Sequence, residues 1–110
     1  MVVPAGVEAA AADGLRLVAA GYAGRGLTTG AVMRARVLAR GGPVSRETVR
    51  KMRNWFRRHH VDRRPNWAGI KTPGWVAWQL WGGSAGWRWT ERLEGGDWVL
   101  PRWAMSSRGA

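Results

Sequence analysis

The run Arg58-His59-His60-Val61-Asp62 groups the residue types that bind metals or carry out acid–base chemistry. On a helix, adjacent histidines project about 100° apart, so His59 and His60 cannot chelate one ion as a pair four residues apart would. No third strong ligand stands at a recognised spacing, and we therefore expect no metal site. His59 fits a helix C-terminus, where positive charge is favoured. We expect Asp62 to pair with an arginine or to cap the next turn.

Other catalytic arrangements are also missing from the sequence. The chain has no cysteine, which excludes thiolate nucleophiles, disulfides and cysteine-ligated metal centres. Ser45 and Ser84 stand where helices are expected to begin, and the other serines lie near the end of the chain. The glycine-rich run 21–26 lacks the Gly-Lys-Ser/Thr ending of a phosphate loop. We expect a protein that is not an enzyme, with no catalytic residue and no cofactor.

Positive charge is the strongest chemical feature of the chain. Lys and Arg number 18 against 7 Asp and Glu, a formal net charge of +11, and only Lys51 and Lys71 of these bases are lysine. Nine of the eleven net charges fall between Arg34 and Arg64. Arginine binds phosphate bidentately, and such a block favours a polyanionic partner. Two alternatives remain open. The block could form a solvated surface without a partner, and the arginine bias could come from the codon usage of a GC-rich genome.

A helix from Ser45 to His59 or His60 is expected to display this charge. Ser45 is a suitable N-cap, and Val49, Met52 and Phe56 share one face at helical period. A second face carries a stripe of four arginines, Arg46, Arg50, Arg53 and Arg57, within an arc of about 60°. We predict that the apolar face is buried and that these guanidiniums stand outward together. The expected nucleic-acid-binding residues are Arg46, Arg50, Lys51, Arg53, Arg57, Arg58, Arg63, Arg64, Arg34 and Arg36.

The preceding segment makes a helix-turn-helix-like pair with this helix. A helix capped by Thr28 or Thr29 is expected to run to Arg40, before a break at 41–43. Met33 and Val37 are expected to face inward. A helix-turn-helix offers the N-terminal residues of its second helix to the major groove. The arginine stripe could equally follow phosphates without reading bases.

The remaining pattern predicts further short helices and no strand. One covers 7–20, with Leu15 and Val18 on one face; another starts at Thr72-Pro73 and ends at Gly82-Gly83; a third, capped by Ser84, runs to about Leu93. The apolar piece 98–105 is hard to assign because of its proline. The fold class is therefore all-α: one compact domain, 1–105, of four to five short helices. Its basic half covers about 26–64 and its Trp-rich half 65–105, before a flexible tail, 106–110. No stretch approaches the roughly 18–20 apolar residues of a membrane span, so we expect no membrane partner.

Nine tryptophans are more than a small core needs. Most are expected in the core, since each can bury roughly 150–250 Å². Trp75, Trp78 and Trp81 recur every third residue and therefore drift around a helix, which places at least one at the surface or in an interface. Trp55, Trp75 and Trp78 are the candidates for stacking on an unpaired base or for anchoring a protein partner. The sequence does not separate these two uses.

Two blocks of sequence carry a resemblance to known proteins. The first combines Thr28-Thr29-Gly30, Arg34-Ala35-Arg36 and the run Trp55 to Asp62, which contains Arg-His-x-Val-Asp; the second, Pro73 to Trp89, contains Ala-Trp-x-Leu-Trp-Gly-Gly. In these residues the stretch 26–89 resembles a small helical domain of tailed-phage and prophage proteins. That domain occurs alone or appended to larger proteins, head-maturation proteases among them. This sequence departs from the pattern at His60, at Ser84 and in a short loop before Pro73.

The resemblance implies a phage origin and a role close to the packaged genome or the head, in the host bacterial cytoplasm or the virion. Together with the basic helix, it leads us to expect a non-enzymatic nucleic-acid-binding protein whose partner is double-stranded DNA. The alternative is a virion structural protein, a minor or decorating head component that contacts phage head proteins, packaged DNA or both. A host-takeover factor that binds a host protein is a third possibility. The sequence predicts no oligomeric state.

Overall fold

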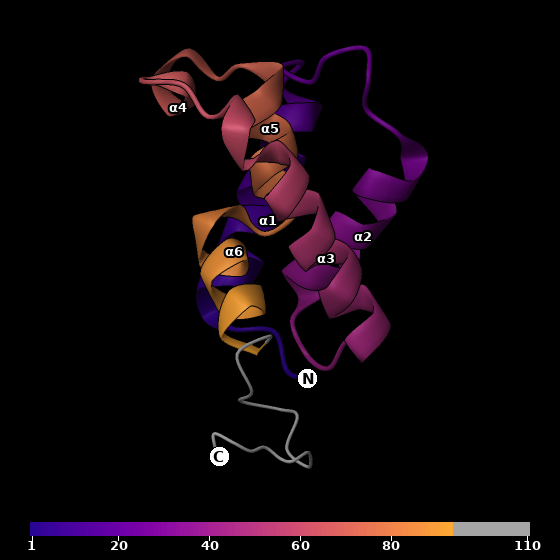
Figure 1. Cartoon of the computed structure of the whole chain (residues 1–110). Coiled ribbons are helices and arrows are strands. Elements are labelled where there is room, and N and C mark those ends of the chain that lie inside the picture. The colour runs from indigo at the N-terminus through magenta and orange to yellow at the C-terminus, as the bar shows by residue number, and fades with distance from the viewer. Residues whose placement is uncertain (94–110) are drawn as a thin grey trace.

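The computed structural model describes residues 1–93, and within that range it is entirely helical (Figure 1). The expected pieces 98–105 and 106–110 lie outside the described residues. The elements in chain order are α1 (Ala5–Ala19), α2 (Thr29–Arg40), α3 (Arg46–His59), the 3-10 turn η1 (His60–Asp62), α4 (Trp67–Ile70), α5 (Pro73–Leu80) and α6 (Gly83–Arg92). Five of the α-helices in this part of the chain have at least eight residues, which confirms the expected all-α class.

Three of the helices begin where the sequence predicts an N-cap. The side-chain oxygens of Thr28, Ser45 and Thr72 each accept a hydrogen bond from the backbone N–H three residues on, all at 3.1 Å. Each bond satisfies one of the N–H groups that have no partner inside the helix. Helix α2 ends at Gly41, whose positive φ of 74° is a conformation that favours glycine.

The start of α6 differs from the expectation that Ser84 caps it. Gly82 occupies the N-cap position with φ of 117°, and the helix itself begins at Gly83, also at positive φ. These two glycines let the chain turn directly out of α5, so the helix starts one residue before Ser84. The Ser84 hydroxyl instead accepts a hydrogen bond from Trp78 Nε1 at 3.1 Å.

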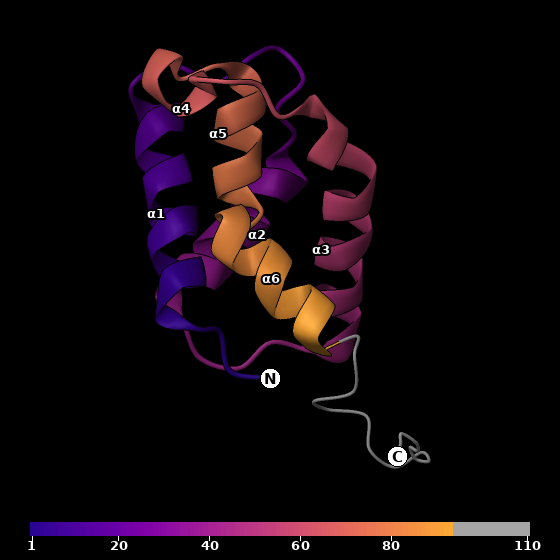
Figure 2. The same ribbon diagram turned by 60° about the vertical axis from the view of Figure 1, so that its left-hand side comes forward.

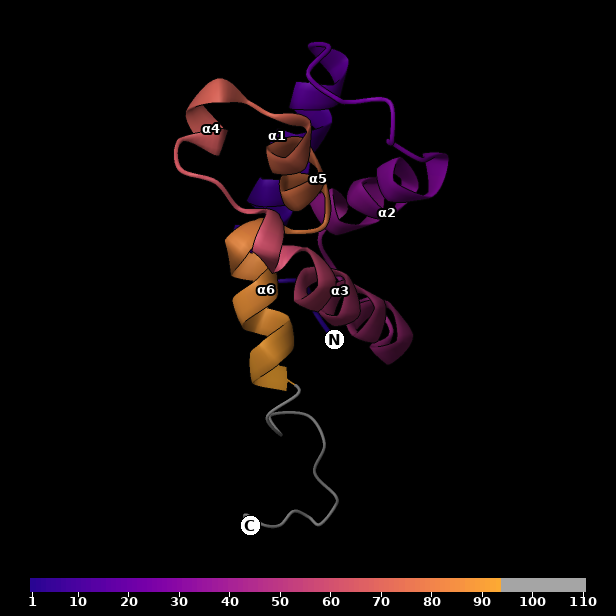
Figure 3. The same cartoon turned by 45° about the horizontal axis from the view of Figure 1, so that its top comes forward.

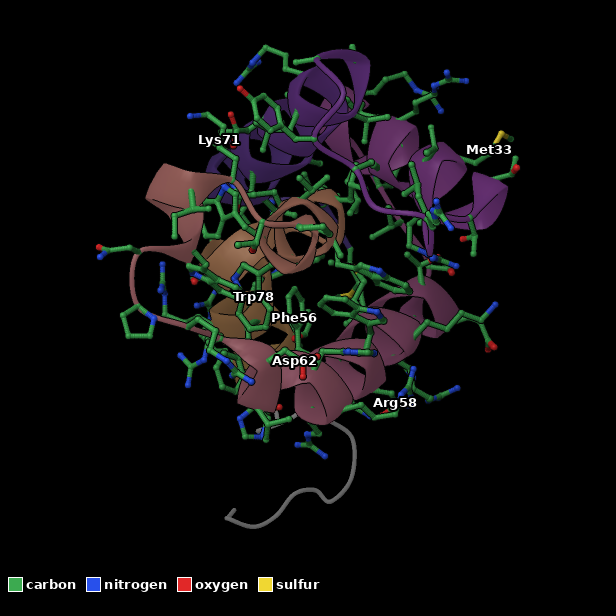
Figure 4. The ribbon with its side chains drawn as sticks, turned by 90° about the horizontal axis from the view of Figure 1, so that it is seen from above. Met33, Phe56, Arg58, Asp62, Lys71 and Trp78 are labelled. Atoms are coloured by element: carbon green, nitrogen blue, oxygen red, sulfur yellow. The ribbon has the colours of Figure 1, made fainter. Side chains whose placement is uncertain are left out.

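The face of α2 that packs inward also differs from the prediction. Met33 and Val37 are exposed (56% and 38%), whereas Ala35 and Leu38 are fully buried. In Figure 4 Met33 lies at the edge of the molecule. Helix α2 packs chiefly against α1, whose buried residues include the small Ala11. Close approach of two backbones favours the alanine side of α2 over its bulkier side. The predicted Leu15 and Val18 of α1 are half-buried at the border of the core.

The helices surround a continuous column formed by α5 and α6. In Figure 2 this column runs down the middle, with α1 on one side, α3 on the other and α2 behind. In Figures 1 and 3 α4 lies on the side of α5 away from α2. Helices α2 and α3 follow one another across 41–45, but α2 packs on α1 and α3 packs on α6. The two helices of the predicted helix-turn-helix-like pair thus have different packing partners.

The core centres on a contact between α3 and α5. Phe56 is fully buried, and its ring meets the edge of Trp78 at 4.9 Å between centroids. Around this pair lie other buried apolar side chains from all the long helices, among them Leu38, Met52, Leu80 and Trp89. Five further tryptophans are half-buried against the core, Trp55, Trp67, Trp75, Trp81 and Trp87. The expected Trp-rich core is therefore present.

Candidate nucleic-acid interface and aromatic pocket

Helix α3 is held by the face that the sequence predicts. Val49, Met52 and Phe56 are all fully buried, which confirms the apolar period of the helix. Glu47 lies in the first turn, and Arg57, Arg58 and His59 lie in the last, an arrangement that the helix dipole favours at both ends. The opposite face of α3 is consequently displayed on a rigid support.

The ten predicted nucleic-acid-binding residues do not share one environment. Eight are exposed: Arg36, Arg46, Arg50, Lys51, Arg57, Arg58, Arg63 and Arg64. Arg34 and Arg53 are half-buried. Arg34 lies on α2 with its guanidinium over the Trp81 ring, and Arg53 lies on α3, which packs against α6. Figure 4 shows Arg58 directed outward from α3, away from Phe56 and Trp78 in the centre.

The predicted stripe of four outward guanidiniums is wrong at half-buried Arg53 and at Arg57. The Nε and one terminal nitrogen of Arg57 donate to the two carboxylate oxygens of Glu91 on α6, at 2.7 and 2.8 Å. These hydrogen bonds hold the pKa of the Glu91 carboxyl below its ordinary value, against the opposing effect of partial burial. Arg57 therefore fastens α3 to α6. Arg50, by contrast, makes only an exposed contact of 3.5 Å with Glu47.

Four bases of α3 and of the segment that follows η1 make no ion pair with any acid of residues 1–93. Lys51 and Arg58 are exposed on α3. Arg63 Nε donates to the carbonyl of His60 at 3.0 Å, and Arg64 donates to the carbonyls of Val61 and Arg63, both at 3.0 Å. Carbonyl acceptors orient a guanidinium without neutralising it, and each guanidinium has five N–H donors. We call Lys51, Arg58, Arg63 and Arg64 the basic edge.

Asp62 has a different partner from the one predicted. Its carboxylate lies 3.0 Å from His59 Nδ1, rather than on an arginine or at a turn cap. The 3-10 turn η1 that directly follows α3 brings this residue back beside the last helical residue. His60 turns the other way and stacks on Trp87 of α6, with ring centroids 5.3 Å apart. In the described part of the chain, no three His, Asp or Glu side chains gather as metal ligands would.

Trp55 and its neighbours form an ordered column of rings. Trp55 stacks on His59 at 4.5 Å and on Trp81, the C-cap residue of α5, at 5.0 Å, with interplanar angles of 24° and 11°. The guanidinium of Arg34 lies 4.3 Å above the Trp81 ring, a cation–π contact. Helices α2, α3 and α5 each contribute to this column. Arg34, a predicted phosphate contact, is therefore engaged in packing.

The three tryptophans proposed for stacking or anchoring have different outcomes. Trp78 is only 1% exposed and donates to Ser84, so its selection was wrong. The reason is that α5 lies in the middle of the bundle, where the rings of Trp55, Phe56, Trp67 and Trp87 surround Trp78. Trp55 is half-buried with rings stacked on it, and Trp75 is half-buried with a tilted contact to Trp67.

Beside the stacked rings of His59, Trp55 and Trp81 lies a pocket of about 510 Å³. The loop between α1 and α2, the end of α3, α4 and α5 line it together. Four indoles form much of its wall, those of Trp55, Trp67, Trp78 and Trp81, and His59 and Asp62 supply its ionisable groups. The volume lies in the roughly 300–1,000 Å³ range typical of small-ligand sites, as does the combination of apolar wall and few polar groups.

Sequence reasoning missed this pocket, together with Trp67, Trp81 and Glu91. The pocket joins segments from 23 to 81, which no local pattern relates. Only the spacing of His59 and Asp62, three residues apart, carried a usable signal. No helix in residues 1–93 is long and apolar enough to cross a membrane. Comparison of the chain with protein-family models, with curated proteins and with solved structures finds no significant match, so the resemblance to the phage domain stays a prediction.

Proposed function

We propose that this chain is a non-enzymatic, phage-encoded nucleic-acid-binding protein that binds double-stranded DNA through the outer face of α3 and the basic edge. The observation that carries the proposal is the basic edge itself: four cations with no acid of residues 1–93 to neutralise them. Lys51 and Arg58 stand on α3, which the fully buried Phe56 fixes, and Arg63 and Arg64 directly follow η1. Such a surface attracts phosphates, and its binding to them releases the counterions that are condensed on the nucleic acid.

The geometry favours phosphate contact over base reading. Helix α3 has 14 residues and is therefore about 21 Å long, enough to follow a strand over several phosphates. Arg63 and Arg64 are oriented by backbone carbonyls, which lowers the ordering cost of a phosphate contact. Phosphate contacts set affinity and register and carry no sequence information, so we expect weak sequence preference.

The salt dependence of duplex affinity tests the proposal. If each cation of the basic edge meets one phosphate, the slope of log K against log salt is about −3.6, which is about 150-fold between roughly 50 and 200 mM. Arg58→Gln should reduce the slope by about 0.9, or about 3.5-fold in affinity over that range. An affinity that is absent, or flat across this range, refutes the proposal.

A matched variant separates the surface from the net charge. Arg16 is also an exposed helical arginine, but it lies on α1, on the far side of the molecule from α3 in Figure 2. Arg16→Gln removes the same charge as Arg58→Gln and should leave the slope unchanged. Equal slopes for the two variants would show that only net charge matters and would contradict binding through α3.

One observation favours a second candidate, a virion structural protein in contact with phage head proteins. Met33 and Val37 are exposed one turn apart on α2, and exposed apolar groups beside arginine are typical of protein contacts. Mass spectrometry of purified virions tests it: a stoichiometric amount in the particle favours a head component, and absence from the particle favours an intracellular DNA-binding protein. A host-takeover factor has no specific observation in its favour.

A further inference from the structure

We propose that the indole-lined pocket beside α3 takes one unpaired nucleobase of the nucleic acid that lies on the basic edge. The inference rests on the proposed function and adds to it a recognised feature of the ligand, an extra base outside the duplex stack. Three observations carry it. No ring of the described residues stacks on the indole face of Trp67; His59 and Asp62 bring hydrogen-bonding groups to the pocket; and the basic edge lies beside it.

Trp67 supplies the stacking platform. Trp55 already has stacked rings on it, and Trp81 lies between Trp55 and the Arg34 guanidinium, so a ligand meets these two walls chiefly at their edges. Trp67 contacts Trp75 and Trp78 only at tilts of 60° and 51°, and no ring of the described residues stacks on it. Trp67 is half-buried and lines the pocket. Aromatic platforms of this kind bind bases through their π faces.

His59 and Asp62 supply the polar corner. Asp62 accepts from, or pairs with, Nδ1 of His59, which leaves Nε2 as the ring atom able to contact a ligand. The carboxylate also has acceptor capacity beyond its contact with His59. Nucleobases present ring nitrogens and exocyclic amino groups at their edges, and adenine offers an amino donor to such a corner. The pocket is therefore suited to a flat ring with polar edges.

Charge connects the pocket with the proposed DNA surface. Arg58 precedes His59, and Arg63 follows Asp62, so the basic edge begins at the residues that line the pocket. Asp62 and Trp78 both line the pocket, and Figure 4 shows Arg58 directed outward from α3. Phosphates held at the basic edge would place the intervening sugar and base at the pocket. An uncharged apolar ligand would make no use of this border.

The test compares two DNA duplexes that differ only by a single bulged adenine, at one salt concentration. The wild-type protein should bind the bulged duplex at least about tenfold more tightly, because stacking of one base on an aromatic platform is worth roughly that much. Trp67→Leu should reduce this ratio to about one, whereas Trp67→Phe should retain most of it. Affinity for the fully paired duplex should not change in either variant.

Filling the pocket gives a second route that leaves every tryptophan in place. Ala77 lines the pocket from α5, and Ala77→Leu adds three carbon atoms to its wall. Ala12→Leu makes the same change at a half-buried position of α1 that does not line the pocket. Ala77→Leu should abolish the preference for the bulge and Ala12→Leu should keep it. Circular dichroism shows which variants fold, and Ala77→Leu decides the question if Trp67→Leu does not.

The outcomes separate the two proposals. Salt-dependent binding of both duplexes with equal affinity overturns the base pocket and leaves DNA binding intact. A bulge preference that persists in folded Ala77→Leu also overturns the pocket, since the bulge is then recognised elsewhere. Absence of binding to both duplexes overturns the proposed function and the pocket with it.

Discussion

The ion pair between Arg57 of α3 and Glu91 of α6 gives the most quantitative prediction. Glu91→Gln keeps the size of the side chain but replaces a carboxylate that accepts two hydrogen bonds from Arg57, at 2.7 and 2.8 Å. The amide can accept only one of these bonds and carries no charge. The Glu91 side chain is 36% exposed and Arg57 49%, so water screens the pair. We therefore expect a loss of about 1 kcal/mol, at the upper end for exposed pairs because the contact is bidentate.

The pH dependence of this loss follows from the lowered pKa of Glu91. The folded protein holds the carboxyl deprotonated more tightly than the unfolded chain does, so the stabilisation is fully present above the unfolded-state pKa. It disappears as the pH falls through the lowered folded-state pKa. The wild-type protein and Glu91→Gln should therefore differ at neutral pH and converge in acid. Unfolding by urea at several pH values measures the difference.

Glu47→Gln is the matched control for this substitution. Glu47 is 66% exposed and reaches Arg50 at only 3.5 Å, so its loss should cost less than about 0.5 kcal/mol. At neutral pH, Glu91→Gln should lower the melting temperature by about 4–8 °C. A double-mutant cycle with Arg57→Gln isolates the pair itself. A coupling energy near zero would refute the conclusion that Arg57 holds α3 against α6 through Glu91. Equal losses of stability in the two Glu→Gln variants would refute it as well.

Three further predictions concern the fold. Phe56→Ala should cost about 3–5 kcal/mol in urea unfolding, because a fully buried ring leaves a cavity, while Val61→Ala at a 65% exposed position should stay within about 0.5 kcal/mol. Gly14→Ala should destabilise the protein, since the new Cβ would lie 2.7 Å from the backbone nitrogen of Leu80. Gly30→Ala in α2, with 3.9 Å of space, should instead stabilise it by about 0.5–1 kcal/mol, as thermal melting would show. Ser84→Ala should cost about 1 kcal/mol in the wild-type protein and nothing in a Trp78→Phe background; an equal cost in both would restore the helix-cap role.

Local signals were enough to predict α3 from the sequence. Its start depends on one side-chain cap, at Ser45, and its buried face on one regular spacing of apolar residues. Helix α2 has the same kinds of signal, yet its buried face was predicted wrongly. The hydropathy of Met33 suggested an inward side chain, whereas close approach to α1 selects the face that carries Ala35. Packing between helices decided this case, and a single helix does not encode it.

The candidate site was predictable only as a list of charges. The sequence places Arg34, Arg57 and Arg58 in one basic block, but it cannot tell that they have three different roles. The first lies on the ring of Trp81, the second binds a carboxylate 34 positions further along the chain, and the third remains exposed. Long-range contacts made that division. Other contacts between segments far apart in the sequence form the pocket. Spacing alone therefore predicted a larger set of outward arginines than the structure displays.

One physical property links arginine and tryptophan side chains in this chain. A guanidinium packs flat against an indole and keeps its charge, so it can cover a half-buried ring where a lysine would have to remain hydrated. Arg34 on Trp81 and Arg63 on Trp87, at 4.3 and 5.0 Å, are such contacts. They let a small domain place aromatic rings near its surface without exposing a large apolar patch. Arg63 belongs to the basic edge and Trp81 lines the pocket, so under the two proposals above a phosphate and a neighbouring base would meet the same kind of arginine and tryptophan surface.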